Sequence, residues 1–238
     1  MKICCLGHSG FLVQWSDYVL VIDCVLDNTN RLSEELNEAK KVYVMSTHGH
    51  HDHFSMQIFD LYKRYGNVVY ILSTDIEEIV NNKQSECKIK YMNKGESYID
   101  KETGFEVKAY GSTDMGISLL MNIDGKKVFH AGDLNNWHWE CESTKEEIEV
   151  AESMFNQELD YLQIDIDEID VAMFPVDARM EGDYARGARQ FLQRFKVRNF
   201  MPMHTWGMWD KSFDTKQYIN EDFGKCICLK TGECVTLK

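Results

Sequence analysis

Short apolar runs separated by polar turns predict the strands in the first part of the chain. Strands are expected over residues 2–6, 11–23, 41–46 and 67–73. Ser16-Asp17 interrupts the second run and predicts a hairpin turn there. Apolar residues at helical spacing predict short helices over 31–40, 54–65 and 74–80. Thr74 is the expected N-cap of the last helix, because acidic residues follow it in the first turn.

The second part of the chain begins with a block of strands and continues with alternating helices and strands. The strands of the block are expected over 88–92, 97–99, 105–110, 117–123 and 127–130. Asp124-Gly125, between the last two, predicts a tight hairpin. The later elements are an acidic helix over 143–164, a strand over 170–176, a helix over 183–195 and a strand over 198–204. Residues 214–238 predict a short helix and a final hairpin around Thr231-Gly232.

The order of these elements indicates the fold class. Strands come in two blocks, each followed by helices, and both blocks contain hairpins. This pattern fits an α/β (α+β) fold in which two mixed β-sheets stack and helices cover the outer faces, a four-layer αββα sandwich. No Pro-rich or Gly/Ser-rich linker and no internal repeat divides the sequence, so we expect a single domain over residues 1–238.

Charge and hydropathy narrow the possible partners. The 39 acidic residues outnumber the 26 basic ones, which gives a formal net charge of −13. Nucleic acid is therefore an unfavourable partner, since phosphate binding depends on clustered Lys and Arg, and a small-molecule substrate is expected instead. No apolar stretch approaches the ~20 residues that a membrane-spanning helix needs, and no signal peptide is evident. We expect a cytoplasmic protein; the sequence indicates no oligomeric state.

The eight cysteines are expected to be free thiols. Without a secretory signal, a reducing compartment is the expected environment, and free Cys behaves as a small buried hydrophobic residue. Cys226, Cys228 and Cys234 lie on two expected neighbouring strands near the C-terminus. A thiolate zinc site at these three residues is the alternative.

Candidate chemistry is concentrated in Thr47-His48-Gly49-His50-His51-Asp52-His53, which holds four of the eight histidines. The segment lies between the expected strand over 41–46 and the expected helix over 54–65, so its side chains can converge on one point. Imidazole and carboxylate together suit zinc, manganese or iron rather than calcium or magnesium. A solvated His-rich loop is the alternative, but such a loop would not normally contain an Asp and follow a buried strand.

The pattern His48-x-His50-x-Asp52-His53 resembles the HxHxDH signature of the metallo-β-lactamase-fold hydrolases. The resemblance implies the αββα sandwich and two metal positions that later strand ends help to complete. Gly132-Asp133 is similar to the strand-ending Gly-Asp of the family, whose carboxylate bridges the two metals. His204 is similar to the last family histidine. The resemblance therefore implies a second metal position formed by Asp52, His53, Asp133 and His204.

The first metal position departs from the family pattern. The family usually supplies a third histidine from a Gly-His-Thr segment, but Ser112 stands at the corresponding place here. His48 and His50 thus lack a third imidazole, for which the oxygen of Asp114 or a water is the candidate replacement. We expect one or two divalent metals per chain, one bound tightly and one weakly. Zinc is the first expectation, and oxygen-rich coordination shifts the preference toward manganese or iron(II).

Four further residues are candidates for positions around the metals or the substrate. Asp23 ends an apolar run and is a candidate acceptor for a ligating histidine, or else an ordinary turn residue. His8, in Gly7-His8-Ser9-Gly10, is similar in setting to the opening of the lactonase-like and uncharacterised hydrolase branch; it lines the pocket or serves only the turn. Asp177 and Arg179 contact substrate or form a surface salt bridge, and Asp177 is also a candidate metal ligand.

Aromatic residues lie beside two of the expected metal ligands. Trp137 and Trp139 follow Asp133, and Trp206 and Trp209 follow His204. Together with His138, Trp137 and Trp206 are the expected residues of an aromatic-walled pocket, with packing in the core as the alternative.

These observations predict a hydrolase that uses a metal-activated water. A metal lowers the pKa of its water to about 7, and the nucleophile so formed can attack a carbonyl or phosphorus centre. Asp52 is expected to orient this nucleophile, and Asp133 to bridge the metals. A small ester, lactone or phosphoester is the expected substrate. An iron-dependent redox enzyme on the same fold, or a metal-binding sensor without catalysis, is the alternative.

Overall fold

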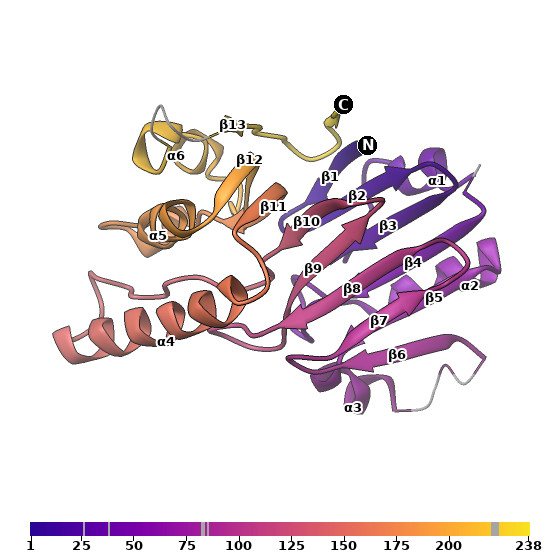
Figure 1. The fold of residues 1–238 in the computed structure, drawn as a ribbon, viewed down its shortest axis with the longest axis horizontal. Helices are drawn as coiled ribbons and strands as arrows, with labels where there is room; N and C mark the ends of the chain where they lie inside the picture. Colours follow the sequence, from indigo (N-terminus) through magenta and orange to yellow (C-terminus); the bar gives the residue numbers. More distant parts are fainter. Residues whose placement is uncertain (26, 38, 82–83, 85, 220–223) are drawn as a thin grey trace. The chain divides into compact units, whose positions relative to one another are not determined.

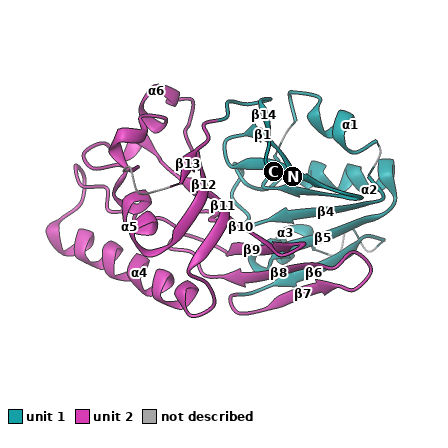
Figure 2. Cartoon of the chain, turned by 45° about the horizontal axis from the view of Figure 1, so that its top comes forward, with its two compact units in different colours: residues 1–93, 229–238 teal, residues 94–228 magenta. Residues whose placement is uncertain are grey.

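The computed structural model describes residues 1–25, 27–37, 39–81, 84, 86–219 and 224–238. They form two compact units, which Figure 2 distinguishes by colour. Unit 1 comprises residues 1–93 and 229–238, and unit 2 comprises residues 94–228. Each unit contains one mixed β-sheet of seven strands, as the two blocks of apolar runs predict. The single domain over residues 1–238 stays a prediction.

The sheet of unit 1 has the strand order β14-β1-β2-β3-β4-β5-β6. Its strands are β1 (Lys2–Gly7), β2 (Gly10–Trp15), β3 (Tyr18–Ile22), β4 (Lys41–Ser46), β5 (Val68–Ser73), β6 (Lys88–Met92) and β14 (Cys234–Thr236) (Figure 1). Strands β3 to β6 are parallel to one another, whereas β1 pairs antiparallel with both β2 and β14. The helical segments are α1 (Arg31–Glu35), η1 (Met56–Phe59), α2 (Asp60–Tyr65), η2 (Thr74–Ile76) and α3 (Glu77–Val80).

The helical segment after β4 packs on one face of this sheet through the apolar side chains that its spacing predicts. Ile58 and Phe59 belong to a buried cluster with Val44 and Tyr70. The Phe59 and Tyr70 rings lie 4.6 Å apart, and the Tyr70 hydroxyl donates to the Ile58 carbonyl at 3.0 Å. These contacts hold the residues that follow the histidine segment against the sheet.

The sheet of unit 2 has the strand order β13-β12-β11-β10-β9-β8-β7. Its strands are β7 (Ser97–Asp100), β8 (Phe105–Tyr110), β9 (Ser118–Ile123), β10 (Lys126–His130), β11 (Glu168–Pro175), β12 (Lys196–Met203) and β13 (Lys225–Cys226). Strands β7 to β10 are antiparallel, and β10 to β13 are parallel. The helical segments are α4 (Lys145–Gln163), η3 (Ala178–Met180), α5 (Arg186–Arg194), α6 (Trp209–Ser212) and η4 (Thr215–Gln217).

Stacked phenylalanines form the core under the helices of unit 2. Phe191 of α5 lies 4.6 Å from Phe174 of β11 and 5.5 Å from Phe129 of β10, measured between ring centroids. Helix α4 begins at a capping box, in which Thr144 and Glu147 each accept a hydrogen bond from the other's backbone. The acidic helix expected over 143–164 is therefore confirmed with its start two residues later.

Three local predictions are wrong. Thr74 is not a helix N-cap, because it is itself the first residue of η2 and no side-chain cap bond is present there. The helix expected over 31–40 ends at Glu35, and Glu38 lies outside the described residues. The final hairpin does not form, because β13 pairs with β12 in one sheet and β14 pairs with β1 in the other. Residues 220–223 of the last predicted helical segment are outside the described residues.

The expectation of eight free thiols is wrong for one pair. Cys4 and Cys234 are opposite each other in the β1–β14 ladder and form a disulfide. Cys226 and Cys228 remain free, with their sulfurs 3.9 Å apart, and Cys234 is unavailable for a thiolate zinc site with them. Burial raises the pKa of the Cys5 thiol to about 11, which suits a thiol that only packs in the core. Among the described helices, none is long and apolar enough to span a bilayer.

The disulfide predicts a measurable contribution to stability. Cys234→Ser should lower the free energy of unfolding by about 2–4 kcal/mol, because the cross-link joins residues 230 positions apart and restricts the unfolded chain. Urea denaturation measures this, with Cys141→Ser, an exposed free thiol, as the control. Denatured protein without reductant should show six reactive thiols. A count of eight would contradict the disulfide.

Candidate metal centre

Polar residues follow four strands of unit 1 that run in the same direction. Strands β1, β3, β4 and β5 share this direction, so their carboxyl ends lie at one edge of the sheet. His8 follows β1, Asp23 follows β3, the histidine segment follows β4, and Asp75 lies just after β5. The carboxyl edge of parallel strands is where α/β proteins place their ligand sites.

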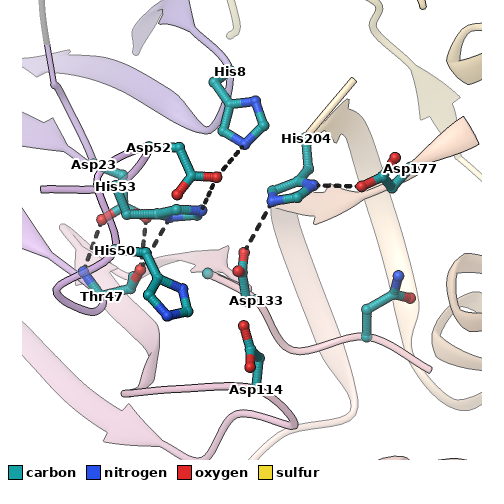
Figure 3. Close-up of polar contacts among 12 residues, drawn as sticks. His8, Asp23, Thr47, His50, Asp52, His53, Asp114, Asp133, Asp177 and His204 are labelled. Carbon is teal, nitrogen blue, oxygen red and sulfur yellow. Dashed lines mark hydrogen bonds and ion pairs between the residues drawn. The ribbon is translucent and has the colours of Figure 1, made fainter. Parts of the chain in front are cut away.

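Asp23 connects two of these strand ends. It is 1% exposed and accepts hydrogen bonds from the Thr47 backbone N–H and from the Thr47 hydroxyl, both at 2.7 Å. Its Oδ2 lies 2.8 Å from Nδ1 of His53 (Figure 3). When Nδ1 donates to this carboxylate, Nε2 of His53 carries the lone pair that a metal takes. Asp23 therefore has the contacts expected of a carboxylate that fixes the tautomer of a metal-binding histidine.

Asp75 holds the turn that carries His48 and His50. Its carboxylate accepts the Gly49 N–H at 2.7 Å, and Nε2 of His48 lies 3.1 Å from Nδ1 of His50. A Cβ at position 49 would lie 2.7 Å from the end of the Ile79 side chain and 3.2 Å from the Asp75 carboxylate, so a larger residue there would displace these side chains. Sequence reasoning missed Asp75, because an acidic residue in a first helical turn gives no signal of such a bond.

Asp52 faces two imidazoles within unit 1. Its Oδ2 lies 3.1 Å from Nε2 of His8 and 3.8 Å from Nε2 of His53. Burial opposes ionisation of Asp52, but the hydrogen bond from His8 and the nearby His53 outweigh it and hold the pKa of the carboxyl below its usual value. Asp52 is therefore an anion at neutral pH, the form that binds a metal or orients a water.

The corresponding edge of unit 2 carries Asp133, Asp177 and His204, which follow the parallel strands β10, β11 and β12. Nδ1 of His204 lies 3.0 Å from the Asp177 carboxylate, and its Nε2 lies 3.4 Å from Oδ1 of Asp133 (Figure 3). Asp177 is fully buried and also accepts hydrogen bonds from Nε and Nη2 of the Arg179 guanidinium. The sequence left its role open between substrate, metal and surface contact; its bonded neighbours are His204 and Arg179.

The ionisation of Asp177 follows from these partners. Burial raises the pKa of its carboxyl, but hydrogen bonds from His204 and Arg179 more than compensate, and the pKa lies below its usual value. A charged Asp177 is the acceptor that directs Nε2 of His204 toward Asp133. The pair Asp177–His204 in unit 2 thus repeats the pair Asp23–His53 in unit 1.

Two of the four expected pocket tryptophans adjoin His204. The ring centroids of Trp137 and Trp206 lie 5.5 and 5.9 Å from that of His204. The Trp137 indole N–H donates to the Asp133 carbonyl at 2.8 Å, and the Arg179 guanidinium lies 4.1 Å over the Trp206 ring. Both rings are thus fixed beside the ligand candidates of this unit.

The remaining aromatic and polar candidates lie elsewhere in unit 2. Trp139 stacks on Trp137, and Trp209 packs on Phe213. His138 is fully buried, with Nδ1 3.0 Å from the Asn136 carbonyl in its own loop. Asp114 is exposed, and its side chain points toward Asp133 (Figure 3). Its backbone N–H donates to the Ser112 hydroxyl at 3.3 Å, so the segment without the family histidine is folded as a local turn.

Several residues of both edges have a left-handed backbone. His8, Asp23, His204 and Trp206 have φ values of 36°, 45°, 59° and 48°. Residues other than glycine rarely adopt this region, and such strain is concentrated at functional sites. The strands end abruptly at these positions, which keeps each side chain at the edge of its sheet.

Comparison with known proteins gives the fold. No family model matches the chain. A UPF0173 metal-dependent hydrolase of Thermococcus kodakarensis is 24% identical over 245 residues, which covers 98% of each protein. Igni18, a metallo hydrolase of Ignicoccus hospitalis, is 18% identical with a TM-score of 0.64, over 100% of this chain and 98% of its own. YhfI of Bacillus subtilis, a metallo-β-lactamase fold protein, is 15% identical with a TM-score of 0.67, over 98% of both chains. This chain has the metallo-β-lactamase fold.

The fold class and the resemblance that the HxHxDH motif indicates are thereby confirmed. The likeness to a UPF0173 metal-dependent hydrolase extends over the whole metallo-β-lactamase fold rather than over the motif alone. The name of this relative, a metal-dependent hydrolase, agrees with the enzyme class that the motif predicts. The substrate is not part of that name.

The Asp23–His53 contact predicts the effect of one substitution on metal binding. Asp23→Asn should weaken the binding of zinc by about 10- to 100-fold, because an amide no longer fixes the His53 tautomer as a carboxylate does. Competition with a chromophoric chelator measures the affinity, and circular dichroism checks that the variant is folded. Asp17→Asn is the control, because Asp17 is exposed and pairs only with Lys40 in unit 1. Unchanged affinity in Asp23→Asn would show that Asp23 does not support a metal ligand.

Proposed function

We propose that this protein is a metal-dependent hydrolase that cleaves a small ester, lactone or phosphoester. The observation that carries the proposal is the repeated carboxylate–imidazole pair. The Asp23 carboxylate lies 2.8 Å from Nδ1 of His53, and the Asp177 carboxylate lies 3.0 Å from Nδ1 of His204. Carboxylates orient the metal-ligating histidines of zinc enzymes in this way. The full-length likeness to a UPF0173 metal-dependent hydrolase also supports the proposal.

The proposed ligands follow the motif. Within unit 1, Asp52 and His53 are the proposed ligands of one metal position, and His48 and His50 are those of the other. Within unit 2, Asp133 and His204 are the proposed ligands. Neutral imidazole and ionised carboxylate are the donors that zinc uses in catalytic sites, and they also suit manganese and iron. Because Ser112 replaces the family histidine, the first metal position, at His48 and His50, would hold its metal less tightly, with Asp114 or a water as its further ligand.

A divalent metal held by these residues would lower the pKa of a water to about 7 and so make a nucleophile available. Asp52, whose pKa lies below its usual value, would accept a hydrogen bond from this water and orient it toward the substrate. Trp137 and Trp206 exclude water around His204 and supply apolar contact for the substrate. The Arg179 side chain is 39% exposed, so it is the candidate contact for a polar substrate group.

Loss of the metal or of its ligands tests the activity. Removal of metal by a chelator, Asp52→Ala and His204→Ala should each lower kcat/KM by at least about 1000-fold, because metal action supplies several kcal/mol of transition-state stabilisation. A panel of a nitrophenyl ester, a simple lactone and a nitrophenyl phosphodiester provides the assay. Asp60→Asn is the control, because Asp60 is exposed and pairs with Lys63. Full activity in both alanine variants would refute the proposal.

The missing histidine predicts unequal metal binding. Metal analysis of protein purified without added metal should give about one zinc per chain, and titration should reveal a second, weaker site. Ser112→His should tighten the weaker site by about 10-fold or more, because it restores an imidazole ligand. Two equally tight zinc ions in the wild type would contradict the expected inequality. Iron with a visible absorption in anaerobically purified protein would favour the redox alternative.

A further inference from the structure

His8 occupies a turn that fixes the direction of its side chain. It follows β1 directly and has a left-handed backbone, with φ of 36° after φ of 129° at Gly7. The side chain is 19% exposed, so most of its ring is buried. The HxHxDH motif does not include His8, which comes forty residues earlier in the sequence.

The ring of His8 meets the two motif residues that its own unit contributes to the second metal position. Its Nε2 lies 3.1 Å from Oδ2 of Asp52, and Nε2 of His53 lies 3.8 Å from the same oxygen (Figure 3). The His8 and His53 rings are nearly perpendicular, with centroids 5.7 Å apart. The three residues each bring one donor atom to within 4.8 Å of the others.

The 3.1 Å separation between His8 and Asp52 matches that between two ligands of one metal ion, and the 3.8 Å separation between His53 and Asp52 is somewhat longer. Ligand atoms about 2.1 Å from a metal lie about 3.0–3.4 Å from one another in octahedral or tetrahedral geometry. One hydrogen bond would explain a single imidazole on the Asp52 oxygen. Two imidazole nitrogens that face the same carboxylate oxygen fit a shared cation as well.

We infer that His8 is an additional ligand of the metal that Asp52 and His53 bind, which gives unit 1 a two-histidine, one-carboxylate donor set. The inference rests on the proposed metal centre. It assigns the tightly held metal to this position, because His8 adds an imidazole here while Ser112 removes one from the other position. This donor set suits iron(II) and manganese as well as zinc.

A cavity borders this donor set within unit 1. It has a volume of about 250 Å³ and is lined by His8, Asp23, Cys24, Asn28, Asp52 and Thr231. The space is large enough for a water or a small substrate group next to the metal position. If His8 binds the metal, the metal position therefore still borders this cavity.

Metal binding by full-length variants tests the inference. His8→Ala should weaken the tighter metal by at least about 100-fold and change the visible absorption of the cobalt(II)-substituted protein, because an inner ligand is lost. His8→Gln should do the same, since its amide can still donate to Asp52 but does not replace an imidazole. His51→Ala is the matched control, because His51 is an exposed histidine that directly precedes Asp52 in the sequence. It should leave both readouts unchanged.

Recovery of wild-type affinity and spectrum in His8→Gln would overturn the inference and reduce His8 to a positioning residue for Asp52. Wild-type binding in both His8 variants, with binding lost in Asp52→Ala, would also overturn it but leave the proposed function intact. Wild-type protein that binds no zinc or cobalt would refute both. X-ray absorption of the wild type and of His8→Gln, each loaded with one metal, counts the imidazoles directly: one imidazole fewer per metal in His8→Gln supports the inference, and an equal number contradicts it.

Discussion

The buried carboxylate of Asp23 is the constraint on which the metal-binding edge of unit 1 depends. An ionised carboxylate that is 1% exposed must be fully hydrogen-bonded, because burying an unpaired charge costs several kcal/mol. Thr47 satisfies it through both its backbone and its hydroxyl, and His53 provides the third contact. These bonds join the end of β3 to the first residue after β4 and to the last residue of the motif. The loop that carries His48 and His50 is thus anchored at both ends, and its ligand candidates occupy fixed positions.

Unit 2 also contains a buried carboxylate that is satisfied by hydrogen bonds, here from a histidine and an arginine. Asp177 is buried at the end of β11, and its donors are His204 after β12 and Arg179 two residues further on. The guanidinium in turn lies over Trp206, so one chain of contacts runs from a buried carboxylate to an exposed ring. In both units the carboxylate follows one parallel strand and the histidine belongs to the segment after the adjacent one. Parallel pairing brings such residues together even though they are 27 or 30 positions apart in the sequence.

The sequence predicts those features that local patterns determine. Short apolar runs identify every long described strand, and helical periodicity identifies α4. The motif identifies the histidine segment because its spacing is compact. The features that could not be predicted depend on distant partners. Cys4 meets Cys234 across 230 residues, and no local signal marks either cysteine. The residues around Thr231-Gly232 look like a hairpin turn, yet β13 and β14 pair with different sheets. Asp75 has an ordinary helix-start setting and still holds Gly49.

The left-handed residues explain how both edges keep their donors in place. A non-glycine residue in this region costs about 1–2 kcal/mol, and His8, Asp23 and His204 all adopt it. For Asp23 and His204, buried hydrogen bonds to Thr47 and Asp177 offset that cost. His8 has a comparable local partner in Asp52, at 3.1 Å. The strain is thus retained where a side chain must leave the end of a strand at a sharp angle. Donors held in this way need little reordering when a cation binds, so less of the binding free energy is lost to ordering side chains.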